Sequence, residues 1–211
     1  MDNRRCRTLA PWAAGVFGTF IVLSQSWAQP TAEPAAGPRV LDPLVGGAAA
    51  LFGTGTDEFE RVFQPLRCQW TSAGKSQARM AESAAAGGPM TLFGGQLEPV
   101  EALVDFTDGR LSQITIHVFT RGDARKEVGR EAFGAMVATC RDGVSRMLGD
   151  RGKARGPGNA GAIRGTDGWV WARPGVAATL EWSSRRVPDR SPGAAGRVFQ
   201  AEFLRLRLAP P

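Results

Sequence analysis

The chain has 211 residues, 43% of them hydrophobic, and a formal net charge of +6. These values are typical of a globular protein and argue against an intrinsically disordered chain. No repeat of about 20 to 50 residues is visible, which argues against a solenoid or a propeller.

The first 28 residues predict a secretory signal peptide. Three arginines stand in the first seven residues, an apolar stretch follows over residues 9–23, and the small residues Ser26 and Ala28 occupy the positions that a signal peptidase inspects. The apolar stretch is shorter than the roughly 20 residues that a spanning helix needs. We therefore expect cleavage after Ala28, export to the periplasm or the exterior, and no stable membrane span after cleavage.

Cleavage would remove Cys6 and leave two cysteines, Cys68 and Cys140. Two thiols in an oxidising compartment predict one disulfide, which would stabilise the fold by about 4 kcal/mol in the chain-entropy model. The alternative is a pair of unbonded buried thiols that pack as small hydrophobic side chains.

Residues 29–40 are rich in proline and alanine and are interpreted as a flexible leader, so that residues 41–211 form a single domain. A short helix is predicted over residues 41–52. A clearer helix is predicted to begin at Thr56, as its N-cap, and to end near Pro65.

After this helix the spacing of the hydrophobic residues changes to the two-residue period of strands. A short strand is predicted over residues 67–71, and residues 72–88 fit a polar loop, a strand or an alanine-rich helix. Alternation over residues 100–106 and the turn signal Asp108-Gly109 predict a hairpin. In its return strand, over residues 111–119, His117 and Phe119 are expected to share one face.

The strongest helix pattern begins at Asp123, the expected N-cap, and ends at Gly149. Its apolar stripe directs Cys140 inward, where Cys68 at the edge of an adjacent strand could reach it. A Gly-rich basic loop is expected over residues 150–168, and three strands are expected over residues 168–172, 177–183 and 198–208.

The resulting order is helix, strands, helix, strands. This order predicts an α+β fold in which two main helices pack on one face of an antiparallel sheet of about six strands.

Basic residues concentrate at the C-terminal end, because residues 141–211 hold thirteen Lys and Arg against six Asp and Glu. Such an excess is compatible with an anionic polymer or an envelope protein as partner, and no nucleic-acid-binding module accompanies it. Solvated arginines on the surface of a secreted protein are the favoured interpretation. The candidate binding surface consists of Trp169, Trp171, Arg205 and Arg207. The two tryptophans are expected on one face of a strand, and for them a place in the core is favoured over an exposed aromatic platform.

We predict no catalytic residue, no metal site and no cofactor. His117 is the single histidine, which excludes two-histidine metal sites. The letters of a dinucleotide fingerprint over residues 156–161 follow a helix rather than a strand. The alternative interpretation is an enzyme or enzyme remnant of hydrolase type that uses His117 with a nearby carboxylate such as Asp105.

Several short segments occur in the order found in a family of secreted bacterial proteins, whose longer members carry a papain-like, C39-type peptidase domain. They are residues 63–71, Trp70-Thr71-Ser72, Leu92-Phe93-Gly94, residues 98–101, residues 105–111, Arg121-Gly122-Asp123-Ala124, Leu180-Glu181-Trp182-Ser183 and residues 201–210. The chain resembles the non-catalytic domain that precedes the peptidase. Because this chain ends at Pro211, the resemblance carries over no peptidase residue.

The sequence therefore predicts a secreted, non-enzymatic α+β domain that serves as a binding or accessory module in the bacterial envelope. An accessory to a separately encoded peptidase is a further hypothesis.

Overall fold

A computed structural model of the chain describes residues 37–81, 88–120, 128–155, 167–188 and 198–211, with the backbone alone for 185–188 and 198–201. These residues belong to one unit, Pro34–Pro211. The predicted signal peptide, most of the predicted leader and the helix start expected at Asp123 lie outside the described residues.

The helices and strands alternate in runs along the chain. In order they are β1 (Arg39–Val40), α1 (Asp42–Gly46), α2 (Ala48–Leu51), α3 (Thr56–Val62), η1 (Gln64–Leu66), β2 (Gln69–Trp70), β3 (Gln77–Ala81), β4 (Met90–Thr91), β5 (Glu101–Thr107), β6 (Arg110–Thr120), α4 (Arg130–Leu148), β7 (Lys153–Arg155), β8 (Asp167–Arg173), β9 (Val176–Pro188) and β10 (Val198–Ala209).

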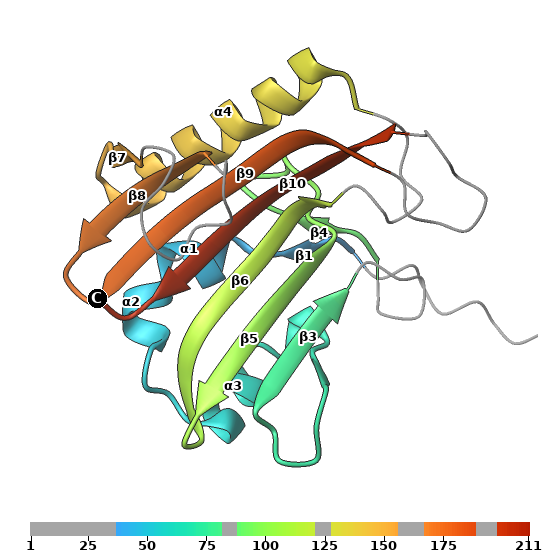
Figure 1. Cartoon of the computed structure of the whole chain (residues 1–211). Helices are drawn as coiled ribbons and strands as arrows, with labels where there is room; N and C mark the ends of the chain where they lie inside the picture. Colours follow the sequence, from blue (N-terminus) through green and yellow to red (C-terminus); the bar gives the residue numbers. More distant parts are fainter. Residues whose placement is uncertain (1–36, 82–87, 121–127, 156–166, 189–197) are drawn as a thin grey trace, which may run out of the picture. The chain divides into compact units, whose positions relative to one another are not determined.

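Eight of these strands form one antiparallel sheet in the order β2-β3-β5-β6-β10-β9-β8-β7, and β1 pairs with β4 in parallel (Figure 1). The predicted α+β fold with an antiparallel sheet is confirmed, with eight strands in place of about six. One strand that the sequence did not indicate is β7, which lies in the segment predicted as a Gly-rich loop.

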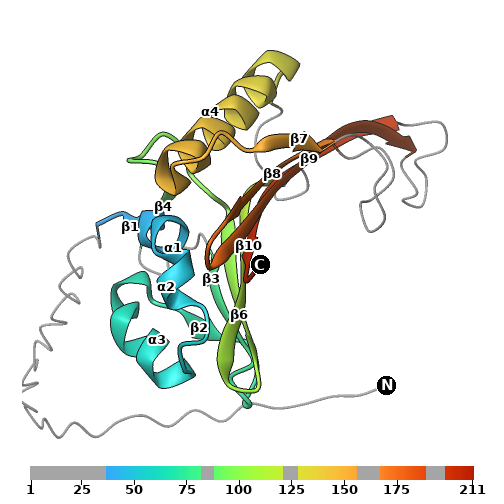
Figure 2. The ribbon, with the colours of Figure 1, turned by 90° about the vertical axis from the view of Figure 1, so that its left-hand side faces the viewer.

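The helices lie on one face of the sheet, as predicted (Figure 2). In β5, Ala102 and Val104 face the helices and are fully buried, whereas Leu103 and Asp105 project to the other side and are partly exposed. We call this second side, opposite the helices, the outer face. At one end β9 and β10 bend toward the outer face (Figure 2), so that this face is concave.

The hairpin between β5 and β6 turns at Asp108 and Gly109, whose φ angles of 51° and 71° are both positive. This is the geometry that an Asp-Gly turn favours, and the predicted hairpin is confirmed. Helix α4 ends as predicted at Gly149, a left-handed C-cap with φ 64°.

The segment before the sheet differs from its prediction in detail. The helix expected over residues 41–52 is divided at Gly47 into α1 and α2. Glycine fits this position because a Cβ atom would lie only 2.8 Å from the Pro43 carbonyl oxygen. Helix α3 starts at Thr56, but its N-cap is Gly55. The last two residues of the predicted leader form β1.

Phe119 faces the helices, so the prediction that it shares a face with His117 is wrong. Consecutive residues of β10 pair with His117 and Phe119, which leaves Val118 as an extra residue in β6. This bulge shifts the alternation by one residue. Phe119 is 4% exposed, and its ring centroid lies 5.8 Å from that of Phe133 on α4.

Candidate functional site

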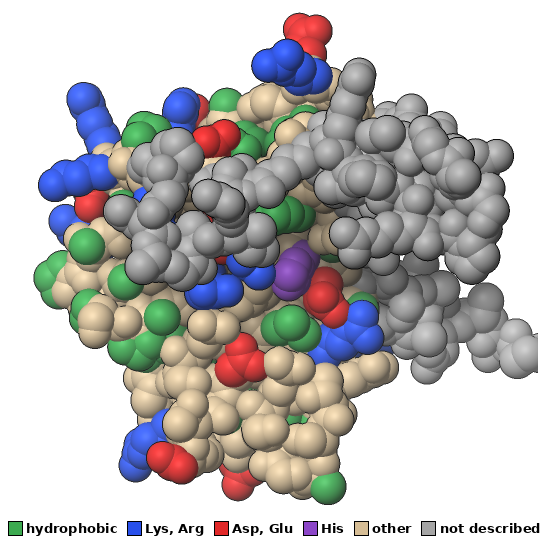
Figure 3. Space-filling view, in the orientation of Figure 1, with side chains coloured by type: hydrophobic (Ala, Val, Ile, Leu, Met, Phe, Trp, Pro, Cys, Tyr) green, Lys and Arg blue, Asp and Glu red, His purple; other side chains and the backbone are tan. Residues whose placement is uncertain are grey.

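Two rows of side chains cross the outer face, because residues in register on antiparallel strands project to the same side. Both rows run from β7 through β8, β9, β10 and β6 to β5. The first, the Glu181 row, consists of Arg155, Gly168, Glu181, Arg205, His117 and Glu101. The second, the Arg207 row, consists of Lys153, Val170, Thr179, Arg207, Thr115 and Leu103. Figure 3 shows this face, with basic and acidic side chains on either side of the histidine.

Glu181 is a nearly buried carboxylate with two guanidinium partners. It is 7% exposed and accepts from Arg205 Nε at 3.1 Å and Nη2 at 2.5 Å, while Arg155 Nη1 lies 3.7 Å away. Arg155 reaches Glu181 across Gly168 of β8, where a Cβ atom would lie only 3.4 Å from the Arg155 Cβ. The absence of a side chain at Gly168 therefore leaves room for this ion pair.

The structure does not place Asp105 opposite His117. In register, His117 lies between Arg205 of β10 and Glu101 of β5, and Glu101 forms an ion pair with Arg79. Asp105 lies opposite Gln113, whose Nε2 donates to its Oδ2 at 3.2 Å. The pair considered for hydrolase chemistry is thus separated along the sheet.

Arg207 has no ion-pair partner among the described residues. Its Nε atom is buried and has no hydrogen-bond partner, an arrangement that costs about 1–3 kcal/mol. Its neighbours in register are Thr115 and Thr179, and Lys153 at the end of the row is exposed. Because this row contains no carboxylate, no member of the row neutralises the positive charge of Arg207.

The four residues of the predicted binding surface do not lie on one surface. Trp169 and Trp171 share a face, as predicted, but it is the face covered by α4. Trp171 is 2% exposed, and its Nε1 donates to Ser145 Oγ of α4 at 3.1 Å. The Trp169 ring centroid lies 5.5 Å from the Arg141 guanidinium of α4. Only the arginine pair of β10 belongs to the outer face.

Sequence reasoning missed most members of the Arg207 row. Lys153, Thr179 and Thr115 come from three separate segments, and only strand register places them in one row with Arg207. The one local signal was the alternation of leucine and arginine at residues 204–208, which does not indicate what lies next to the arginines.

The disulfide predicted from the sequence is absent, since Cys68 and Cys140 are both free. Cys140 lies in α4, which packs on β8 and β9, whereas Cys68 precedes β2 at the opposite edge of the sheet. The helical stripe correctly directed Cys140 inward but did not show which strand it faces. Burial raises the pKa of the Cys68 thiol to about 11, against a smaller opposing effect of Arg39, and it also raises the pKa of Cys140.

We expect the free energy of unfolding to fall between pH 9 and pH 11. The pKa of Cys68 is about 11 in the folded protein against an ordinary 9.0, so in this interval the unfolded chain loses the proton first. The loss is at most about 1.4 kcal/mol per pH unit for this thiol. Urea unfolding of wild type and Cys68→Ala without reductant measures it, and the variant should lose less. A wild-type chain that shows no reactive thiols after unfolding would contradict the free cysteines.

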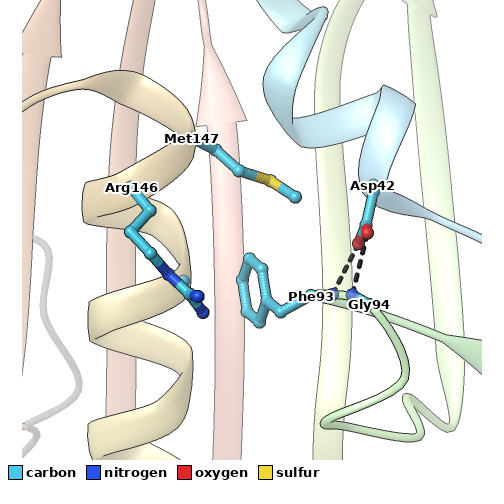
Figure 4. Close-up of a pocket in the computed structure, with 6 residues that line it drawn as sticks. Asp42, Phe93, Gly94, Arg146 and Met147 are labelled. Carbon is cyan, nitrogen blue, oxygen red and sulfur yellow. Dashed lines mark hydrogen bonds between the residues drawn. The ribbon is translucent and has the colours of Figure 1, made fainter.

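A cavity of 330 Å³ lies between α1, α4 and the loop after β4 (Figure 4). The Asp42 carboxylate of α1 accepts from the backbone nitrogens of Phe93 at 2.5 Å and Gly94 at 2.9 Å. Arg146 and Met147 of α4 line the cavity beside the Phe93 ring (Figure 4). Because both oxygens of Asp42 are already bonded, this arrangement joins α1 to the loop rather than presenting a free carboxylate.

Within the described ranges, no helix is both long enough and apolar enough to cross a bilayer. The same residues contain no group of three or more His, Cys, Asp or Glu side chains that could hold a metal ion. No protein-family model, no curated protein and no solved structure matches this chain.

Proposed function

We propose that this protein is an exported, non-enzymatic binding module whose outer face binds an anionic polymer of the bacterial envelope. The observation that carries the proposal is the Arg207 row, in which Lys153 and Arg207 provide positive charge and no member is a carboxylate. The N-terminal pattern of arginines, apolar residues and a small-residue cleavage site supports the exported location.

An extended polymer fits the dimensions of the row. Neighbouring strands lie about 4.8 Å apart, so a row that crosses six strands is about 24 Å long. A flexible chain can follow the concave outer face, whereas a flat bilayer meets such a face only at its rim (Figure 2).

The acidic residues of the outer face argue for a polymer of low charge density. Glu181, Glu101 and Asp105 project from this face next to the basic side chains. Glu181 and Glu101 already take up the charge of the arginines beside them, and Asp105 accepts only from neutral glutamines. Few cations on this face therefore remain for a strand with a phosphate at every unit, such as a nucleic acid. A polymer with widely spaced anionic groups can bind Arg207 without approaching these carboxylates.

The proposal is tested with the full chain, expressed with its own N-terminal segment and purified from the exporting cells. Its binding to polygalacturonate, polyphosphate, phosphatidylglycerol vesicles and neutral dextran is measured at low salt by biolayer interferometry. We expect binding to an anionic polymer that weakens as salt increases, and no binding to dextran. Absence of binding to every anionic probe would refute the proposed function.

A further inference from the structure

We infer that Arg207 anchors a carboxylate group of an acidic polysaccharide, with the ligand seated between Thr115 and Thr179. This inference rests on the proposed function and names the chemical class of the polymer and the residue that selects it. The observations that carry it are the guanidinium of Arg207, which has no ion-pair partner among the described residues, the two flanking hydroxyls and the apolar residues farther along the same row.

The hydrogen-bonding capacity of Arg207 fits a carboxylate. A guanidinium group presents its N–H donors in one plane, and a carboxylate can accept two of these hydrogen bonds at once. The Nε of Arg207 is buried, so a ligand carboxylate would bind the two Nη groups at the end of the side chain. These groups form no hydrogen bond or ion pair with the described residues, in contrast to the guanidinium of Arg205, which donates to Glu181.

The two neighbours in register supply hydroxyl groups. Thr179 is half-buried on β9, and Thr115 is 6% exposed on β6, where its Oγ1 already accepts from Gln113 Nε2 at 3.2 Å. A threonine hydroxyl that accepts one hydrogen bond still has a proton to donate. Sugar hydroxyls and carboxylates both provide acceptors for that proton.

Two apolar side chains lie farther along the row. Val170 and Leu103 are partly exposed, one on each side of Arg207 and two strands away from it, which corresponds to about 10 Å. A pyranose ring presents C–H groups that can pack on such side chains, and a polyphosphate has no equivalent. The sequence of apolar, hydroxyl, cationic, hydroxyl and apolar groups therefore matches a uronate polymer better than a phosphate polymer.

The test compares the affinity of variants of the full chain for polygalacturonate, with polyphosphate and phosphatidylglycerol vesicles as alternative anions. Arg207→Gln is expected to raise the Kd about tenfold or more, because a charge-assisted hydrogen bond is lost. Arg207→Lys should recover little, since lysine has no planar pair of donors. Arg61→Gln removes the same charge from an exposed position on α3 and should leave the Kd unchanged.

Circular dichroism and thermal unfolding establish that each variant is folded. If Arg207→Gln does not fold, the inference is tested with Arg207→Lys and Thr179→Val instead. Thr179→Val is expected to weaken polygalacturonate binding several-fold. Polygalacturonate binding that stays within twofold of wild type in the Arg207 variants would overturn the inference and leave the proposed function intact. Tighter binding to polyphosphate or to the vesicles than to polygalacturonate would also overturn the inference, because it would assign the site to a phosphate ligand. A wild-type chain that binds no anionic probe would instead refute the proposed function itself.

Discussion

Arg39→Ala is expected to lower the free energy of unfolding by about 3–5 kcal/mol. Arg39 is only 3% exposed, and its guanidinium donates to the carbonyl oxygens of Gly88, Leu66 and Ala81 at distances from 2.7 to 3.3 Å. One side chain thereby joins β1 to η1, to the end of β3 and to the segment before β4. Alanine would leave these carbonyls without their donor and open a cavity in their place.

Urea unfolding at neutral pH measures this loss. The free energy of unfolding of Arg39→Lys should lie between those of wild type and Arg39→Ala, because one ammonium group cannot donate to three carbonyl oxygens with the geometry of the planar guanidinium. Burial lowers the pKa of Arg39. Arg61→Ala, at an exposed site on α3, should change stability by less than about 0.5 kcal/mol. A loss of under about 1 kcal/mol in Arg39→Ala would show that solvent replaces the guanidinium without penalty.

Gly143→Ala is expected to lower the free energy of unfolding by about 2 kcal/mol, although alanine is the better helix former. A Cβ atom at Gly143 of α4 would lie 2.4 Å from the Phe93 ring. Phe93 has little freedom to retreat, because its backbone nitrogen is bonded to Asp42 and its φ angle is +54°.

The matched control for this substitution lies on the same helix. A Cβ atom at Gly134 would have no neighbour within 4 Å outside its own helix backbone, so Gly134→Ala should raise the free energy of unfolding by about 0.5–1 kcal/mol. Thermal and urea unfolding of the two variants therefore separate the effect of the contact with Phe93 from the effect of helix propensity on the free energy of unfolding. Equal stabilisation by both would mean that the Phe93 ring moves aside at no cost.

Elements determined by neighbouring residues were predictable from the sequence. The Asp108-Gly109 turn, the end of α4 at Gly149 and the strands β8 to β10 depend on local period and on residues that tolerate positive φ. For the same reason the sequence showed that Trp169 and Trp171 share a face. It did not show which layer covers that face, because α4 packs there through tertiary contacts.

The candidate site was less predictable because it is assembled by register. Arg207 was identified from its alternation with leucines, but Thr115 lies 92 positions earlier in the chain and Lys153 belongs to a strand of three residues in a Gly-rich segment. A helical stripe likewise directed Cys140 inward without giving its separation from Cys68. Pairing between distant segments leaves no periodic trace in a single sequence.

The bulge at Val118 has a consequence for changes in chain length. Deletion of one residue from a regular strand transfers every following side chain to the opposite face. Val118 differs from a residue of a regular strand, because it has no partner on β10. If it were removed, His117 and Phe119 would become neighbours in the chain and would keep their present partners on β10, which are already consecutive residues. Shortening β6 at this point would preserve both the Arg207 row and the helix-covered core, at the cost of one buried valine.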